Sequence, residues 1–123
     1  MSRIGSSVFV RGEVSSSDDL CIEGRVEGPI WCEESAVIIE PSAVVRGDII
    51  GREITVAGVV DGTLLAREVV DIRTSANVTG RVLSARLILN EGGTFHGDVR
   101  PQQAEAALTI AKRRRKEHVN GAS

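Results

Sequence analysis

Apolar and polar side chains alternate along most of the chain between residues 4 and 100. From Leu20 to Ile30, the apolar residues Leu20, Ile22, Val26 and Ile30 share one parity, and Glu23, Arg25 and Glu27 share the other. A period of two with many β-branched residues is typical of a strand that buries one face. The same alternation returns between Val70 and Val82. No stretch before residue 101 has a helical stripe, so the pattern predicts an all-β body of strands of roughly three to six residues.

A Gly-x-apolar unit recurs along this body, at Gly12, Gly28, Gly47, Gly62, Gly80 and Gly97. The intervals are 16, 19, 15, 18 and 17 residues, which average 17. The units are of two types. Copies of the first type, residues 20–30 and 54–64, match at an offset of 34. The second type occupies 6–14, 41–49, 74–82 and 91–99. Because the offset of 34 holds two repeats, the two types are expected to alternate.

Such a repeat favours a parallel β-helix of about six coils. Hairpins would need two-residue Asn-Gly or Asp-Gly turns, and the one such pair before residue 101, Asp61-Gly62, lies inside a repeated unit. Coils stacked at ~4.8 Å would make a rod about 29 Å long. Five glycines of interior parity are expected at corners or close approaches of the wall: Gly24, Gly47, Gly58, Gly80 and Gly97.

The aromatic content supports a narrow interior, because the chain has one Trp, two Phe and no Tyr. Val, Ile, Leu and Ala must then fill the lumen. Cys32 has lumen parity and is expected in the core, whereas Cys21 has outward parity and is expected at the surface. Trp31 also has outward parity, and either makes a lateral contact or covers a turn.

The chain has few residues suited to catalysis or metal binding. Two histidines exclude a three-histidine zinc site, and His96 is expected to be solvated. No Gly-x-x-x-x-Gly-Lys-Ser/Thr phosphate loop is present. The acidic pairs Asp18-Asp19 and Glu33-Glu34 are expected in turns between coils as solvating groups. We therefore expect no catalytic residue, no metal and no cofactor.

Charge divides the chain near residue 101. Residues 104–123 hold five bases and two acids, whereas the rest holds ten bases and fifteen acids. This predicts a β-helical domain over 4–100 and a basic, disordered tail over 101–123. Residues 104–111 are good helix formers, but an isolated helix of that length is marginal in water. The basic cluster is either a solvated end or a contact for partner proteins or anionic surfaces; it comprises Lys112, Arg113, Arg114, Arg115 and Lys116.

The two ends of the predicted rod have no evident cap. Open coils offer unpaired backbone groups and an apolar lumen, and such edges template further pairing. Phe95 either plugs the last coil or packs against another subunit. End-to-end assembly is expected through Ile4, Val8, Val10 and Val14 at one end and Leu87, Leu89, Phe95 and Val99 at the other.

The ordered succession of coils, beginning with residues 4–14 and 20–28, resembles the bactofilin family over residues 4–100. The resemblance implies a right-handed β-helix and a bacterial cytoskeletal scaffold. It also implies nucleotide-independent assembly into non-polar filaments that localise client proteins. Many members carry an N-terminal membrane-contacting segment. Here only Met1-Ser2-Arg3 precedes the first coil, so no N-terminal anchor is expected.

No apolar run approaches the ~20 residues of a membrane span, and no secretory signal is evident. A cytoplasmic, cytoskeletal protein is expected, with peripheral contact at the inner membrane face left open. Two alternatives compete with this hypothesis. A left-handed hexapeptide-repeat enzyme, such as an acyltransferase, has partial support in six-residue spacings but not in the irregular glycine intervals. A nucleic-acid module is disfavoured, because the body is acidic and lacks an aromatic stacking platform.

Overall fold

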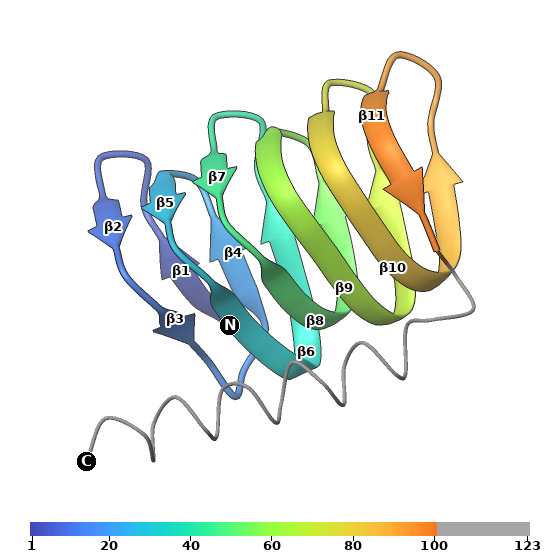
Figure 1. Ribbon diagram of the computed structural model, residues 1–123. Helices are drawn as coiled ribbons and strands as arrows, with labels where there is room; N and C mark the ends of the chain where they lie inside the picture. Colours follow the sequence, from blue (N-terminus) through green and yellow to red (C-terminus); the bar gives the residue numbers. More distant parts are fainter. Residues whose placement is uncertain (101–123) are drawn as a thin grey trace.

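The computed structural model describes residues 1–100, which form one parallel sheet wound into a β-solenoid of about six turns (Figure 1). This confirms the predicted parallel β architecture and coil number. The strands, in chain order, are β1 Ser2–Ile4, β2 Phe9–Arg11, β3 Val14–Ser15, β4 Leu20–Ile22, β5 Arg25–Glu27, β6 Ile30–Ile39, β7 Val44–Arg46, β8 Ile49–Val56, β9 Val59–Ile72, β10 Asn77–Leu89 and β11 Thr94–Val99.

Three walls enclose the lumen, and each turn contributes one segment to each wall. Wall A stacks β1, β4 and the C-terminal parts of β6, β8, β9 and β10. Wall B stacks β2, β5, β7, the starts of β9 and β10, and β11. Wall C stacks β3, the starts of β6 and β8, the middles of β9 and β10, and the end of β11. Every pairing is parallel and nearly in register, so equivalent side chains form columns along the rod.

The lumen is filled by aliphatic columns, as the period-two pattern predicts. In wall B, Val26, Val45, Val60 and Val78 follow one another at 0–1% exposure. In wall A, Ile22, Ile39, Val56 and Ile72 do the same at 0%. Cys32 belongs to the same core cluster, as expected from its parity.

The length of the corner between walls A and B explains the two types of repeat unit. It is two residues long at Glu23-Gly24 and at Ala57-Gly58. Elsewhere it is a four-residue turn closed by a bond from the fourth N–H to the first carbonyl. These turns are 5–8, 40–43, 73–76 and 90–93, with N···O distances of 2.9–3.1 Å. Short and long corners alternate through the first five turns, and the sixth breaks the alternation with a long one (Figure 1).

The strands are longer than predicted. The sequence predicts three to six residues, yet β6, β8, β9 and β10 run for 10, 8, 14 and 13 residues. The reason is that several corners stay extended, so one strand passes through two or three walls. Glu33-Glu34 accordingly lies within β6, at a register shift between Cys32 and Ala36, and the expectation of a turn there is wrong.

The predicted position of Cys21 is also wrong. Its neighbours Leu20 and Ile22 point into the lumen, so Cys21 points outward, yet it is only 2% exposed. Its thiol donates to Glu40 Oε1 at 3.3 Å. Parity gives the direction of a side chain, but it does not reveal which neighbours cover it.

Candidate functional site

The N-terminal end of the rod exposes the first layer of the lumen. Ile4, Val10 and Val14 begin the three lumen columns, and all three are only partly buried where the next turn is buried completely. Val8 lies at the corner between walls A and B, and it is 43% exposed. The strands β1, β2 and β3 each have one partner strand among the described residues, on the side of the second turn. Their outer backbone edges therefore face away from the rod.

The C-terminal end exposes the last layer of the same columns. Leu87 and Leu89 end wall A, Phe95 ends the valine column of wall B, and Val99 ends wall C. Leu89 is 53% exposed and Val99 is 40% exposed, whereas Phe95 and Leu87 are partly buried against the core. Within the described part of the chain, β11 pairs with β10 alone. All eight residues expected at the ends thus lie at the ends, four at each.

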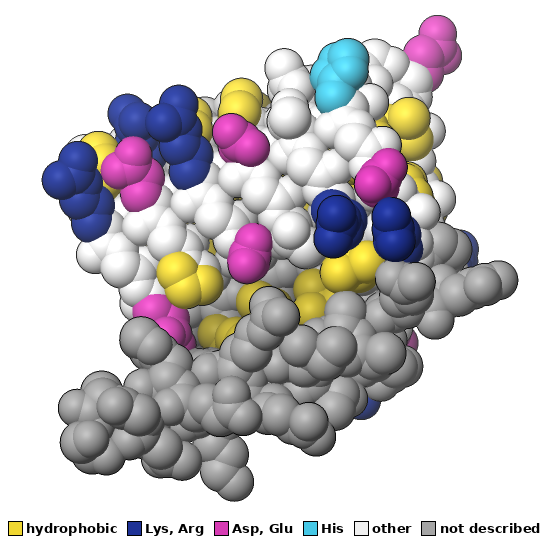
Figure 2. Space-filling model, viewed as in Figure 1, with side chains coloured by type: hydrophobic (Ala, Val, Ile, Leu, Met, Phe, Trp, Pro, Cys, Tyr) yellow, Lys and Arg dark blue, Asp and Glu magenta, His cyan; other side chains and the backbone are white. Residues whose placement is uncertain are grey.

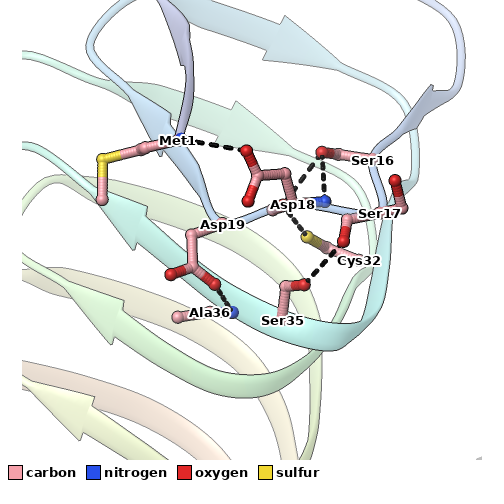
Figure 3. A network of polar contacts seen from close by, with 8 residues as sticks. All are labelled: Met1, Ser16, Ser17, Asp18, Asp19, Cys32, Ser35 and Ala36. Atoms are coloured by element: carbon pink, nitrogen blue, oxygen red, sulfur yellow. Dashed lines mark hydrogen bonds and ion pairs between the residues drawn. The ribbon is translucent and has the colours of Figure 1, made fainter.

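A polar network fixes the corner that leads from the first turn into the second (Figure 3). The Met1 ammonium lies 2.9 Å from Asp18 Oδ2. This contact raises the pKa of the ammonium, and the same hydrogen bond holds the pKa of Asp18 below its usual range. Asp19 Oδ1 accepts the Ala36 N–H at 2.9 Å. Asp18 and Asp19 therefore have structural roles, rather than the purely solvating role expected from the sequence.

Phe9 is an exposed aromatic near the N-terminal end that the sequence pattern did not single out. The residue is 49% exposed, and the guanidinium groups of Arg11 and Arg25 lie 5.5 Å and 5.1 Å from the centroid of its ring. Both arginines also contact the Glu27 carboxylate, at 3.4 Å and 3.5 Å. Basic side chains gather at this corner of the surface (Figure 2). The signal in the sequence is an apolar residue at outward parity beside two arginines on adjacent turns.

A second hydrophobic cluster lies outside the lumen and was also missed. Ile50, Leu65 and Leu83 form it, with Trp31 packed against them. These four residues occupy successive turns of wall C at outward parity. The sequence signal is the doubled apolar pair in each turn, Ile49-Ile50, Leu64-Leu65 and Val82-Leu83. Trp31 packs against this cluster of its own chain, and its two expected roles stay predictions.

The thiols and imidazoles offer no reactive arrangement among residues 1–100. Burial raises the pKa of both the Cys21 and the Cys32 thiols, which keeps them protonated near neutral pH. His96 is exposed, as expected. Over the same range, no group of three or more His, Cys, Asp or Glu residues is placed to hold a metal ion.

Comparisons with known proteins identify the family to which the solenoid belongs. The family model described as "Bactofilin: Polymer-forming cytoskeletal" matches residues 2–100. The chain belongs to the bactofilin family. Bactofilins are polymer-forming cytoskeletal proteins and not enzymes, which removes the hexapeptide-repeat enzyme as an alternative.

Two curated bactofilins of Myxococcus xanthus (strain DK1622) are similar to this chain. Bactofilin BacO is 38% identical over 96 residues, which cover 78% of this chain and 75% of BacO. Bactofilin BacP is 31% identical over 110 residues, which cover 89% of this chain and 45% of BacP. No solved structure matches the chain.

Two further expectations concern membranes and partners. Residues 1–100 contain no helix that is long and apolar enough to cross a bilayer. The basic cluster Lys112–Lys116, predicted to contact partners or anionic surfaces, lies outside the described residues. Its role stays a prediction.

Proposed function

We propose that this bactofilin is a cytoskeletal scaffold whose solenoids join end to end, without nucleotide, into non-polar filaments. Self-association follows from membership of a polymer-forming family. The end-to-end mode, nucleotide independence and a right-handed winding are our inferences, together with the idea that like ends meet. The proposal places the filaments in the cytoplasm, where they recruit client proteins through the basic residues of 112–116.

The observation that carries the proposal is the open lumen at both ends. Leu89 is 53% exposed, whereas the residue before it in the same column, Ile72, is 0% exposed. Val99 is 40% exposed next to Val82 at 0%. Burying apolar surface contributes roughly 25 cal/mol per Å². A second solenoid on either end would bury these side chains and pair the free strand edges in one step.

Phe95→Arg tests the end contact directly. Phe95 ends the wall B column with no turn beyond it among the described residues. An unpaired charge buried in an interface costs about 3–5 kcal/mol. In the monomer, the arginine can extend past the rod into water. We therefore expect a folded, soluble protein by circular dichroism that no longer pellets as filaments.

Val59→Arg is the matched control for the added charge. Val59 is a 43% exposed valine that points outward from the middle of wall B, away from both ends. The same charge there should leave filaments intact. If Phe95→Arg pellets like the Val59→Arg control, the C-terminal turn is not a filament contact and the proposed mode is wrong.

Treatment with apyrase or EDTA tests nucleotide and metal independence. The chain has no phosphate loop, and residues 1–100 hold no candidate metal cluster. The mass of pelleted polymer, measured with and without each treatment, should not change. A clear loss of polymer on either treatment contradicts the proposal.

A further inference from the structure

The outer edge of β2 carries unpaired backbone groups at the N-terminal end of the rod (Figure 1). Among the described residues, β2 pairs with β5 alone. The Val8 carbonyl accepts a hydrogen bond from β5 at 3.0 Å, and the Gly12 N–H donates one to β5 at 2.9 Å. Because successive residues of a strand direct their backbone groups to opposite sides, the N–H and C=O groups of Phe9 and Arg11 point away from β5.

The side chains at this edge are an exposed aromatic ring and an exposed cation. Phe9 is 49% exposed, and the side chain of Arg11 is 80% exposed. The guanidinium groups of Arg11 and Arg25 both lie within about 6 Å of the ring centroid, the range in which a cation is attracted to an aromatic face. Arg25 belongs to the second turn and approaches the ring from the body of the rod. The side of the ring toward the edge of β2 is therefore available to a further cation.

We propose that two chains meet at their N-terminal ends through an antiparallel β2 pair whose twofold axis passes beside Val10. The inference rests on the proposed contact of like ends, and it adds the register and the residues that specify it. Phe9 of each copy lies directly opposite Arg11 of the other, and the two residues exchange both of their outward backbone hydrogen bonds. Opposite residues of paired strands share a face, so both Val10 side chains face the joined lumen, while Phe9 and Arg11 meet outside it.

Neighbouring registers of the same strand pair lack this match. An axis beside Arg11 would set the two Arg11 side chains directly opposite each other, and like charges in that position are destabilising. An axis beside Phe9 would pair the two rings and place Arg11 opposite Ser7, which lies in the corner before β2. Only the axis beside Val10 pairs all the outward backbone groups of both β2 strands and gives each cation a ring.

Joining unlike ends would create unfavourable neighbours instead. If the first turn continued from the last turn of another copy, the columns would place Arg11 beside His96. The glycine column would likewise place Glu13 beside Asp98, which has the same charge. Inside the rod, successive charges in the outer column of wall B are opposite: Arg11, Glu27, Arg46 and Asp61. The charge pattern therefore favours a second copy in the head-to-head orientation.

Disulfide formation by Val10→Cys tests the register, because the axis places this residue opposite itself. Opposite residues without mutual hydrogen bonds have Cα atoms about 4.5 Å apart in antiparallel strands, which is close enough for a disulfide. The native Cys21 and Cys32 are 2% and 0% exposed, so the unsubstituted chain should give little background. With copper–phenanthroline as oxidant, Val10→Cys should form a covalent dimer on a non-reducing gel. The control Val8→Cys, which lies opposite Gly12 in this register, should not.

The outcomes separate this strand pair from the end-to-end assembly on which it rests. Val10→Cys protein that forms filaments in the electron microscope but stays monomeric on the gel overturns the strand pair and leaves end-to-end assembly standing. A disulfide between Val10→Cys and Phe95→Cys proteins in a mixed sample shows that unlike ends meet, and it overturns the strand pair and the contact of like ends together. If the unsubstituted chain forms no filaments, the proposed function fails, whereas a covalent Val10→Cys dimer would still support the pair.

Phe9→Leu and Arg11→Gln test the side chains of the pair. Each interface holds two Phe9–Arg11 contacts, so either change should raise the protein concentration for half-maximal pelleting about fivefold or more. Phe9→Tyr keeps a ring and should leave that concentration unchanged. Arg46→Gln is the control, since Arg46 is exposed in the same outer column two turns from the edge. Circular dichroism checks that each variant is folded. Equal pelleting of Arg11→Gln and Arg46→Gln overturns the pair.

Discussion

At the scale of single residues, a column of glycines holds the corner between walls B and C. Gly28, Gly47, Gly62 and Gly80 stack on successive turns, with φ between +134° and +151°. Side chains rarely adopt this part of conformational space, whereas glycine does so freely. A Cβ on Gly62 would also meet the carbonyl oxygen of Gly47. Both conditions make glycine necessary here, which explains why the Gly-x-apolar unit is the clearest repeat in the sequence.

Gly62→Ala should destabilise the solenoid by about 1–3 kcal/mol, because it adds backbone strain and a contact with the Gly47 carbonyl. Gly5→Ala is the control, since a Cβ there meets nothing within 4 Å. That change should stay within about 0.5 kcal/mol. Urea unfolding followed by circular dichroism measures both. Equal midpoints for the two variants would show that the glycine column does not constrain the corner.

Residue parity predicted the lumen well but not the outer surface. Between the first and last turns, the Ile22 and Val26 columns are buried as the alternation indicates. Cys21 and Ile50 are buried too, although both point outward. Parity follows from the pleat of a single strand. The cover over an outward side chain depends on long neighbours or on distant chain, which a local pattern does not contain.

At the scale of elements, the corners account for the irregular repeat. Gly28 and Gly47 are 19 residues apart because that turn has a four-residue corner after β6 and three residues at the register shift of β6. Gly47 and Gly62 are 15 apart, because the next turn has a two-residue corner and one residue at its shift. The wall segments keep a constant length, and only the corners and register shifts vary. The glycine intervals in the sequence are therefore irregular, although the turns stack evenly.

The four-residue corners 40–43 and 73–76 are hydrogen-bonded to the two-residue corners of the preceding turns. Ser42 Oγ donates to the Glu23 carbonyl at 2.8 Å, and Ser75 Oγ donates to the Ala57 carbonyl at 2.7 Å. In both cases a serine at the equivalent position donates to a backbone carbonyl of the preceding corner. This recurring bond gives a physical reason for long and short corners to alternate. The sequence showed two types of repeat unit, but it did not show that they differ in the length of this corner.

Val78→Arg, in the turn before Phe95, should unfold the rod. Val78 occupies the same wall B column but is 0% exposed and flanked by Val60 and Phe95. The arginine has no path to water there, and an unpaired buried charge costs about 3–5 kcal/mol. That is a large fraction of the roughly 5–15 kcal/mol that stabilises a domain.

Circular dichroism and sedimentation of Val78→Arg beside Phe95→Arg measure the contrast within one column. Loss of β signal is expected only for Val78→Arg. A folded Val78→Arg protein would mean that the column tolerates charge, and the reason given for the solubility of Phe95→Arg would then fail. Val59→Arg, on the outer side of the same wall, supplies the folded reference for both.

At the scale of the whole molecule, the rod separates its two kinds of surface. The ends carry exposed apolar layers, while the sides carry ion pairs such as Arg52–Glu68 at 3.0 Å and Arg67–Glu34 at 2.9 Å. Surface pairs of this kind contribute little to stability, about 0–1 kcal/mol. They keep the sides polar and charged, which disfavours lateral association relative to contacts at the ends. The partly exposed apolar layers of the first and last described turns were predictable from the sequence, because the repeats fill the body almost to residue 100.

Deleting residues 102–123 should preserve filaments and weaken binding to anionic surfaces. The proposed end contacts use residues between 4 and 99, so assembly does not need the deleted segment. The deletion removes five bases and two acids, and the remaining body carries ten bases and fifteen acids. A body with a net charge of −5 should be repelled by anionic vesicles. Binding by the full chain should also fall with added salt, since exposed charges are screened within ~8 Å at physiological ionic strength.

Co-sedimentation with vesicles of defined anionic lipid content, with electron microscopy of the same samples, measures both effects of the deletion. Substituting Lys112–Lys116 by glutamine within the full chain is the matched control, because it removes the charge and keeps residues 104–111. This variant should lose vesicle binding as the deletion does. Loss of filaments in the deletion would contradict assembly through the terminal turns alone. Retained vesicle binding in the glutamine variant would mean that the basic cluster is a solvated end and not a contact.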